Sequence, residues 1–150
     1  MAKAQAKCLA AAAALVCFLA APARAQVPDP YARDLARDLA QAERGMGELS
    51  FARAAGPFAG ALSERTVQRF QVTLRAGQHY RIVGFCDARC GGLSLRLSDS
   101  GDLLVRDTVM FGRGPMIDAR PRMTGPHTIE VSMQRCAEPP CYFAFTIFSR

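Results

Sequence analysis

The spacing of apolar residues changes once along this chain, and the change separates one helix from a series of strands. Near the start, apolar residues recur every three or four positions, the period of an amphipathic helix: Tyr31, Leu35, Leu39 and Ala42. Asp29 and Pro30 are residue types that favour a helix start, and Gly45 favours its end. The pattern predicts one helix over residues 30–44, whose apolar stripe must bury against its own domain or against a partner.

The stretch from Ser50 to Leu62 has no clear period and predicts a connector. From Val67 onward, apolar and polar residues alternate, which is the period of half-buried strands. Short runs of this kind recur about every ten residues: 67–74, 80–84, 93–98, 103–105, 115–121, 128–133 and 143–148. Such a series without intervening helices predicts an all-β fold: a jelly-roll-like antiparallel β-sandwich of about seven to eight strands, preceded by the short amphipathic helix.

The first 25 residues have the three parts of a secretory signal peptide. Lys3 and Lys7 precede an apolar run of about fourteen residues, which is too short to cross a bilayer core of about 30 Å, and Ala23-Arg24-Ala25 follows it. We therefore expect no transmembrane segment. The predicted organisation is a signal peptide at 1–25, a helix and connector at 26–57 and a β-sandwich domain at 58–150.

Export to the periplasm or the cell exterior would place the remaining cysteines in an oxidising compartment, where disulfides form. These cysteines lie in two close pairs: Cys86, Cys90, Cys136 and Cys141. Zinc binding together with His79 or His127 is the alternative, but structural zinc sites pair their ligands at tighter spacings. Chain entropy favours long-range links among the three possible connectivities. A hairpin around residues 137–140 would instead set its flanking cysteines face to face, and this geometry predicts the local pairs 86–90 and 136–141.

Charge gives a weak indication of the partner. Cleavage would remove Lys3, Lys7 and Arg24, which lowers the formal net charge from +6 to +3. The remaining basic residues are all arginine and are scattered among acidic residues, unlike the basic stripe with stacking aromatics that binds nucleic acid. We expect a monomer that binds no nucleic acid. Its partner would be an unknown protein or an acidic envelope polymer, and the affinity for it should fall as the salt concentration rises.

No motif for catalysis, cofactor binding or metal binding is present. The serines lie in no GxSxG elbow, and neither His79 nor His127 belongs to an HExxH pair. The aspartates of the predicted loops and strand ends show no EF-hand spacing: Asp87, Asp99, Asp102, Asp107 and Asp118. We expect no catalytic residue, no cofactor and no metal site, and therefore a binding or accessory module. The alternatives are a small secreted hydrolase with an unrecognised site, and an envelope structural or chaperone-like factor that acts through the N-terminal helix.

Several segments, taken in order, resemble the bacterial pre-peptidase C-terminal domain family. These segments are Phe70–Leu74 with Ala76–Ile82, Leu93–Leu97 with Asp99 and Gly101, and Thr124-Gly125 before Ile129–Val131. The cysteines resemble those of a stand-alone, signal-bearing subgroup, which has a Cys-Asp-x-x-Cys element and a cysteine pair around the final hairpin: Cys86, Asp87, Cys90, Cys136 and Cys141. The resemblance covers about Phe58 to Arg150.

The family consists of small β-sandwich modules that are often appended to secreted peptidases. The resemblance therefore implies a module without peptidase activity of its own, with a role in binding, secretion or stability. The chain departs from the subgroup at Ala88-Arg89 and Gly91-Gly92, where the subgroup tends to be acidic. This departure removes acidic ligands from any cation site that the family builds at this turn.

Overall fold

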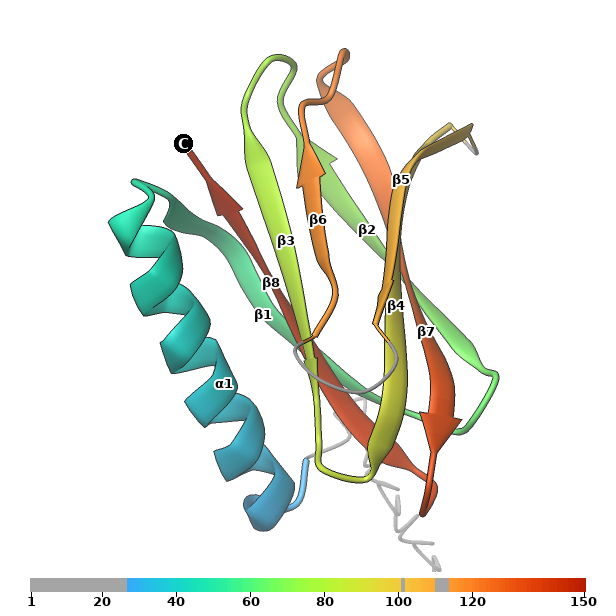
Figure 1. Ribbon diagram of the computed structural model, residues 1–150. Helices are drawn as coiled ribbons and strands as arrows, with labels where there is room; N and C mark the ends of the chain where they lie inside the picture. The colour runs from blue at the N-terminus through green and yellow to red at the C-terminus, as the bar shows by residue number, and fades with distance from the viewer. Residues whose placement is uncertain (1–26, 101, 110–113) are drawn as a thin grey trace, which may run out of the picture.

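The computed structural model describes residues 27–100, 102–109 and 114–150, so the predicted signal peptide lies outside the described residues. The elements in chain order are α1 (Asp29–Glu48), β1 (Ala52–Leu62), β2 (Val67–Leu74), β3 (Tyr80–Cys86), β4 (Cys90–Asp99), β5 (Asp102–Val109), β6 (Met116–Ala119), β7 (Gly125–Cys136) and β8 (Cys141–Ser149). The strands form two antiparallel four-stranded sheets, ordered β1-β8-β3-β6 and β2-β7-β4-β5 (Figure 1). The prediction of a β-sandwich preceded by one helix is confirmed.

The core between the sheets is built from the alternating positions that the sequence shows. Many of these side chains have no exposed surface, among them Ile82, Leu95, Leu97, Ile117, Ile129, Val131, Phe143 and Phe145. β8 is buried on both faces, because its odd-numbered residues face this core while Ala144 contacts a second apolar cluster beneath α1. A strand in the middle of a sheet and under a helix therefore reads as a nearly continuous apolar run.

The helix α1 lies along the outer face of the sheet that contains β1, β8 and β3 (Figure 1). Leu35 is buried there with Phe85 and Ala144, and Leu39 and Ala42 pack against the same cluster. The apolar stripe of α1 is therefore buried against the protein's own β-sheet.

The ends of α1 differ from the prediction. The helix starts with Asp29 inside its first turn, without a side-chain capping hydrogen bond, and it continues through Gly45 and Gly47 to Glu48. A glycine inside a helix costs only about 1 kcal/mol. Contacts at the end of the helix offset this cost, because the N–H of Phe51 donates to the carbonyl of Met46 over 2.9 Å.

The prediction of a connector from Ser50 to Leu62 is wrong, because most of this stretch is β1. β1 pairs with β8 from Ala52↔Ser149 to Leu62↔Cys141, with register shifts on either side of Ala55. Its residues are small and largely exposed, so they show no alternation. Pairing with a strand about ninety positions away, rather than local pattern, makes this segment a strand.

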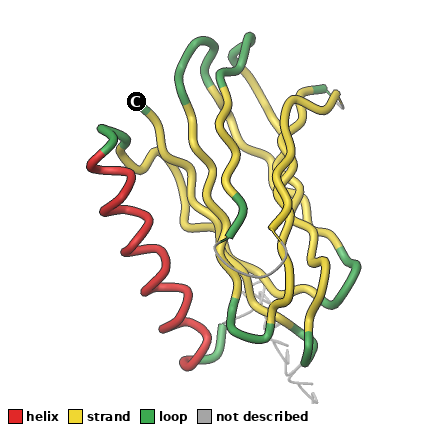
Figure 2. The backbone as a smooth tube through the Cα atoms, in the orientation of Figure 1, coloured by secondary structure: helices red, strands yellow, loops and turns green. Residues whose placement is uncertain are grey.

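The turns gather at two ends of the sandwich, which Figure 2 shows in green. The disulfide end, lower in Figure 1, contains the first turn of α1 and the turns 87–89 and 137–140. The arginine end, at the top, contains residues 49–51, the turns 75–79 and 120–124, and the last residues of β8. No helix in the described ranges is long and apolar enough to cross a membrane.

Candidate functional site

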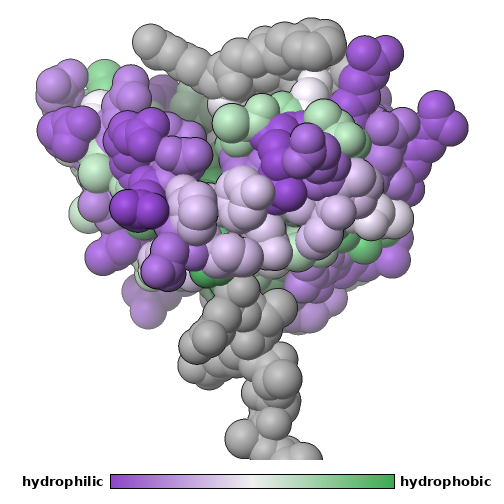
Figure 3. Space-filling model, turned by 90° about the horizontal axis from the view of Figure 1, so that it is seen from below, coloured by the Kyte–Doolittle hydropathy of each residue, from purple (hydrophilic) through white to green (hydrophobic). Residues whose placement is uncertain are grey.

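The disulfide end holds both disulfides side by side. Cys86–Cys90 and Cys136–Cys141 have Cα–Cα distances of 5.9 and 5.8 Å, and Cys90 faces Cys136 across the β4–β7 ladder. These are the local pairs that the hairpin geometry predicted. Figure 3 views this end from below and shows hydrophilic residues over much of that face, with paler residues between them.

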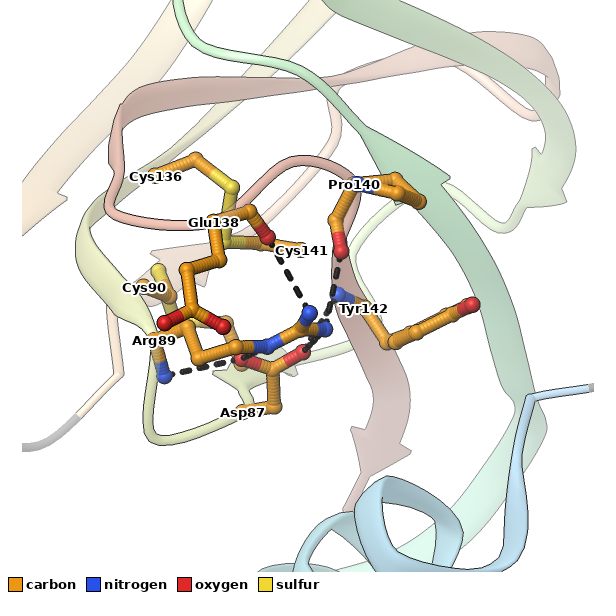
Figure 4. Close-up of polar contacts among 9 residues, drawn as sticks. Asp87, Arg89, Cys90, Cys136, Glu138, Pro140, Cys141 and Tyr142 are labelled. Atoms are coloured by element: carbon orange, nitrogen blue, oxygen red, sulfur yellow. Dashed lines mark hydrogen bonds and ion pairs between the residues drawn. A yellow bond between two sulfur atoms is a disulfide. The ribbon is translucent and has the colours of Figure 1, made fainter.

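Asp87, between the cysteines of the first pair, is the anchor of this end (Figure 4). Its side chain has no exposed surface. Oδ1 accepts a 2.9 Å hydrogen bond from the N–H of Arg89, and Oδ2 accepts bonds from the Arg89 guanidinium (2.8 Å) and the Tyr142 N–H (2.7 Å). The carboxylate therefore ties the β3–β4 turn to the first residues of β8.

Arg89 completes this anchor from the other side. Its guanidinium donates to the carbonyls of Glu138 (3.0 Å) and Pro140 (2.8 Å) as well as to Asp87. The ring of Tyr31 covers it at 3.9 Å from the ring centroid and stacks on Tyr142 at 5.2 Å. The hydrogen bond to Asp87 raises the pKa of Arg89 above its ordinary value. The partly exposed guanidinium of Arg89 thus pairs with the buried carboxylate of Asp87 and joins the hairpin to the first turn of α1.

At the arginine end, His79 joins segments that lie far apart in the sequence. Its Nε2 lies 2.7 Å from Oδ1 of Asp118, and its Nδ1 lies 3.3 Å from guanidinium nitrogens of both Arg120 and Arg150. The His79 carbonyl also accepts a 3.1 Å bond from the N–H of Arg150. The ring of Phe51 meets the imidazole edge-on at 4.9 Å. The start of β3, the end of β6 and the end of β8 therefore meet at one buried imidazole.

The partners of His79 define its tautomer. A guanidinium can only donate, so Nδ1 carries the lone pair and Nε2–H donates to Asp118. Arg81 adds a 3.0 Å hydrogen bond to the other oxygen of Asp118. Desolvation acts to raise the pKa of Asp118 and is the largest single influence, but the hydrogen bonds from Arg81 and His79, with the charge of the Arg81 guanidinium, together lower this pKa below its ordinary value. Asp118 is therefore ionised at neutral pH.

This pair differs from the Asp–His pair of a hydrolase triad. In a triad, the second ring nitrogen faces a nucleophile. In the described residues, Nδ1 of His79 faces two guanidinium groups, and no hydrogen bond joins the ring to a serine, threonine or cysteine. His79 is placed to position arginines.

The fold gathers arginines that are scattered in the sequence. The turns 75–79 and 120–124 lie side by side, because the N–H of Gly77 donates to the Pro121 carbonyl and the N–H of Ala76 donates to Oγ1 of Thr124, each over 2.9 Å. Five arginines lie at this end: Arg75, Arg81, Arg120, Arg122 and Arg150. Asp118 is the carboxylate among them, and within the described ranges Arg75 and Arg122 form no ion pair.

His127 also follows a turn, yet it is buried inside the sandwich with 2% of its surface exposed. Its Nδ1 lies 3.0 Å from the Gly125 carbonyl, and its Nε2 has no partner in the described structure. The His127 side chain is therefore not accessible to a ligand at the surface. Both histidines thus lie next to turns and are buried.

The aspartates do not converge on a common point. Asp87 binds Arg89, Asp118 binds His79 and Arg81, and Asp107 accepts a 2.8 Å hydrogen bond from the N–H of Met116. Asp99 and Asp102 face each other across the β4–β5 turn. Within the described part of the chain, no group of three or more potential metal ligands is present.

A cleft of about 600 Å³ opens next to the arginine end, between the edge strands of the two sheets. One wall is formed by Ala54, Ala55 and Phe58 of β1, and the other by residues 71–75. Gln78, Tyr80, Ile147 and Ser149 line the space between them. Neither the cleft nor the arginine cluster was foreseen. Both arise where segments some forty to a hundred positions apart come together, and the only local signal was the excess of arginine.

Comparison with known proteins finds no matching family model and no matching curated protein. Similar solved structures include PliG, a periplasmic inhibitor of g-type lysozyme from Aeromonas hydrophila, at 16% identity and a TM-score of 0.45, covering 61% of this chain and 84% of that one. They also include the pre-peptidase C-terminal domain of a collagenase from Bacillus anthracis, at 9% identity and a TM-score of 0.49, covering 61% of this chain and 87% of that one.

A third similar structure is a CBM36 carbohydrate-binding module in complex with calcium and xylotriose, at 13% identity and a TM-score of 0.37, covering 65% of this chain and 96% of that one. At these identities and scores, the ligands of these proteins say nothing about the ligand of this chain. The resemblance to the pre-peptidase C-terminal domain family stays a prediction.

Proposed function

We propose that this protein is an exported, non-catalytic β-sandwich module of the periplasm or cell exterior that binds an acidic partner at its arginine end. The observation that carries the proposal is the charge at this end, where five arginines lie on adjoining turns and strand ends and Arg81 is paired with Asp118. Such a field attracts anionic groups and raises their rate of association.

The arrangement around His79 supports binding over catalysis. His79 holds Arg120 and Arg150 on one side and Asp118 on the other, so its ring nitrogens are engaged. A buried, hydrogen-bonded imidazole orients the guanidinium groups before a ligand arrives, which lowers the ordering cost of binding. The alternative of a small hydrolase has no such support from the geometry.

The other alternative is a structural or chaperone-like factor that acts through α1. That role needs an apolar helix face that is free to engage a partner. The stripe of α1 is instead buried on its own sheet through Leu35, and the helix is fastened near its end by a 3.1 Å ion pair between Glu43 and Arg53. We therefore favour the arginine end as the binding surface.

The test is titration of the purified chain, residues 26–150, with poly-L-glutamate at rising salt. We expect measurable binding that weakens steadily with salt, and a loss of at least about tenfold in affinity when Arg75, Arg120 and Arg122 are all replaced by Gln. The matched control replaces Arg33, Arg37 and Arg44 on the exposed face of α1 by Gln, which changes the net charge by the same amount. Equal losses in the two triple variants would show that net charge alone, and not the arginine end, drives binding.

A further inference from the structure

The cleft between β1 and β2 is a wedge with a closed and an open end. At the closed end the two strands touch, since a Cβ added to Gly60 would lie 2.6 Å from Oε1 of Gln68. Further along, the rings of Phe58 and Phe70 still lie 5.9 Å apart. Beyond them the pairing of β1 with β8 has register shifts on either side of Ala55, and the cleft extends to Arg75 and Gln78 at the arginine end. Two strand edges therefore diverge without pairing with each other.

The register of β2 shows which backbone groups face this cleft. Thr73 lies opposite Pro126 on β7. In an antiparallel ladder, facing residues alternate between pairs that exchange two hydrogen bonds and pairs that exchange none. Proline has no N–H, so Thr73 and Pro126 form a pair of the second kind. The N–H and C=O of Thr73 therefore point away from β7, and by the same alternation so do those of Gln71.

These outward groups lie where the cleft is lined by residues 71–75. β2 is an edge strand of its sheet, so no further strand satisfies them. Water can solvate them, but a row of alternating N–H and C=O groups at strand spacing matches one ligand chemistry, the backbone of an extended polypeptide.

Arg75 supplies a charge at the mouth of the cleft. Its N–H is bound to the Tyr80 hydroxyl at 3.0 Å, which places the residue at the junction of the two sheets. Its side chain is exposed and forms no ion pair within the described ranges. An acidic group at one end of a bound strand would meet this guanidinium.

We propose that an acidic, extended peptide segment of a partner protein adds as a fifth strand to the free edge of β2, with its carboxylate-bearing end at Arg75. The proposal rests on the proposed function in taking the chain to be a binding module, and it names the class of ligand. The bound segment pairs with Gln71 and Thr73, and small side chains enter the wedge over Phe58.

Other occupants fit the cleft less well. Sugars bind on exposed aromatic faces, but Tyr80 is 5% exposed and the ring of Phe58 stacks on that of Phe145 at 4.8 Å. A second copy of this chain, paired antiparallel along β2 about Val72, would bring Arg69 of each copy towards Arg75 of the other. Like charges in facing positions destabilise such a pair.

The experiment uses synthetic acetylated octapeptides in which valine and threonine alternate and two aspartates end the sequence, varied at each position on an array. The tightest binder is resynthesised with N-methyl groups on one alternating set of amides or on the other. We expect one methylated set to lower affinity at least about tenfold and the other to change it less than about twofold, because only one set of amides faces β2. Equal effects of both sets, or no octapeptide binding above its scrambled control, would overturn the proposal.

The protein side of the test uses two substitutions at one position. Thr73→Pro removes a backbone N–H that faces the cleft and leaves the β7 ladder intact, whereas Thr73→Ala keeps that N–H. We expect Thr73→Pro to weaken peptide binding at least about tenfold and Thr73→Ala less than about twofold. Equal weakening by both variants would point to the side chain and reject strand addition. If Thr73→Pro is unfolded by circular dichroism, the methylated peptides on the unaltered protein still decide.

Two controls separate this proposal from the arginine end. Binding of dextran sulfate, a polyanion without a peptide backbone, should be the same in Thr73→Pro and the unaltered protein, so failure of strand addition leaves the proposed function standing. Replacing the two aspartates of the peptide by asparagine should weaken binding about threefold to the unaltered protein and not at all to Arg75→Gln. Xylan oligosaccharides or a second copy of the chain that displaced the peptide completely would identify a different occupant and reject the proposal.

Discussion

The two ends of this sandwich differ in how fully their arginines are paired. At the disulfide end, Arg89 donates to a buried carboxylate and to two backbone carbonyls, and an aromatic ring covers it. At the arginine end, Arg81 is paired with the half-exposed Asp118, and Arg150 donates to the Leu49 carbonyl. Arg120 and Arg150 approach a histidine nitrogen, and Arg75 has no acidic partner in the described structure. The difference teaches that an arginine count says little by itself. What matters is whether the fold supplies an acceptor for each guanidinium.

The largest expected effect is on stability at the disulfide end. Asp87→Ala removes a buried carboxylate and leaves the N–H of Tyr142 and part of the Arg89 guanidinium without an acceptor. We expect a loss of about 3 kcal/mol in the free energy of unfolding, measured by urea denaturation followed by circular dichroism. Asp102→Ala, at an exposed turn, should lose less than about 0.5 kcal/mol. A small effect of Asp87→Ala would mean that the anchor is dispensable.

The disulfides should contribute less than this anchor. Each closes a loop of only a few residues, so replacing Cys136 and Cys141 by Ser should cost about 2 kcal/mol and leave a folded protein. Replacing Cys86 and Cys90 should cost a similar amount. Peptide mapping without reduction checks the pairing, and a crosslink between the two pairs would contradict the local links Cys86–Cys90 and Cys136–Cys141.

A smaller, pH-dependent effect is expected at the arginine end. Because the pKa of Asp118 is lowered in the folded state, its contribution to stability is present above the ordinary carboxyl pKa of about 3.9 and is lost as the pH falls through the folded value. Asp118→Asn should therefore lower the melting temperature slightly at pH 7 and not at all near pH 2. Its side chain is 50% exposed, so solvent screening keeps the effect small.

The same variant sharpens the comparison of the two ends. Removing the carboxylate of Asp118 from among five arginines should strengthen poly-L-glutamate binding by about twofold. Asp87→Ala, assayed at a temperature where it remains folded, should leave that binding unchanged. Weaker binding by Asp118→Asn would mean that Asp118 matters chiefly by holding His79 and its arginines in place.

The last prediction concerns the predicted signal peptide, residues 1–25. We predict cleavage after Ala25, because small residues at Ala23 and Ala25 suit signal peptidase and Gln26 begins the polar part of the chain. Intact mass of the protein from the envelope of a bacterial host checks this. A product that retains Met1 would contradict the predicted cleavage and with it the proposed export.

The sequence predicts those parts of the fold that rest on local periodicity. The strands from Val67 onward and the apolar face of α1 follow from alternating and helical spacing. β1 does not, because Ala52–Leu62 consists of small residues whose strand form depends on pairing with β8. The continuation of α1 through Gly45 is likewise decided by tertiary contacts and not by propensity.

The sites divide in a similar way. The local cysteine pairs could be predicted from spacing and hairpin geometry, because five or six residues determine each loop. Arg89, the partner of Asp87, lies only two positions away in the sequence. The sequence pattern marks Arg89 only as a departure from the acidic residues of the subgroup. The cluster around His79 could not be foreseen, since Asp118 and Arg150 lie 39 and 71 positions from it and meet it only through the order of the strands.

That strand order also constrains when the protein can fold. β8 lies between β1 and β3 in its sheet, so the first strand of the sandwich and the third both wait for the eighth as their neighbour. Ala52 pairs with Ser149, a contact that spans nearly the whole domain. A chain that emerges N-terminus first, from a ribosome or a translocation channel, cannot assemble this sheet until Ser149 has emerged. Contacts of such long range make folding slow, and the earlier strands stay exposed to proteases until β8 is available for pairing.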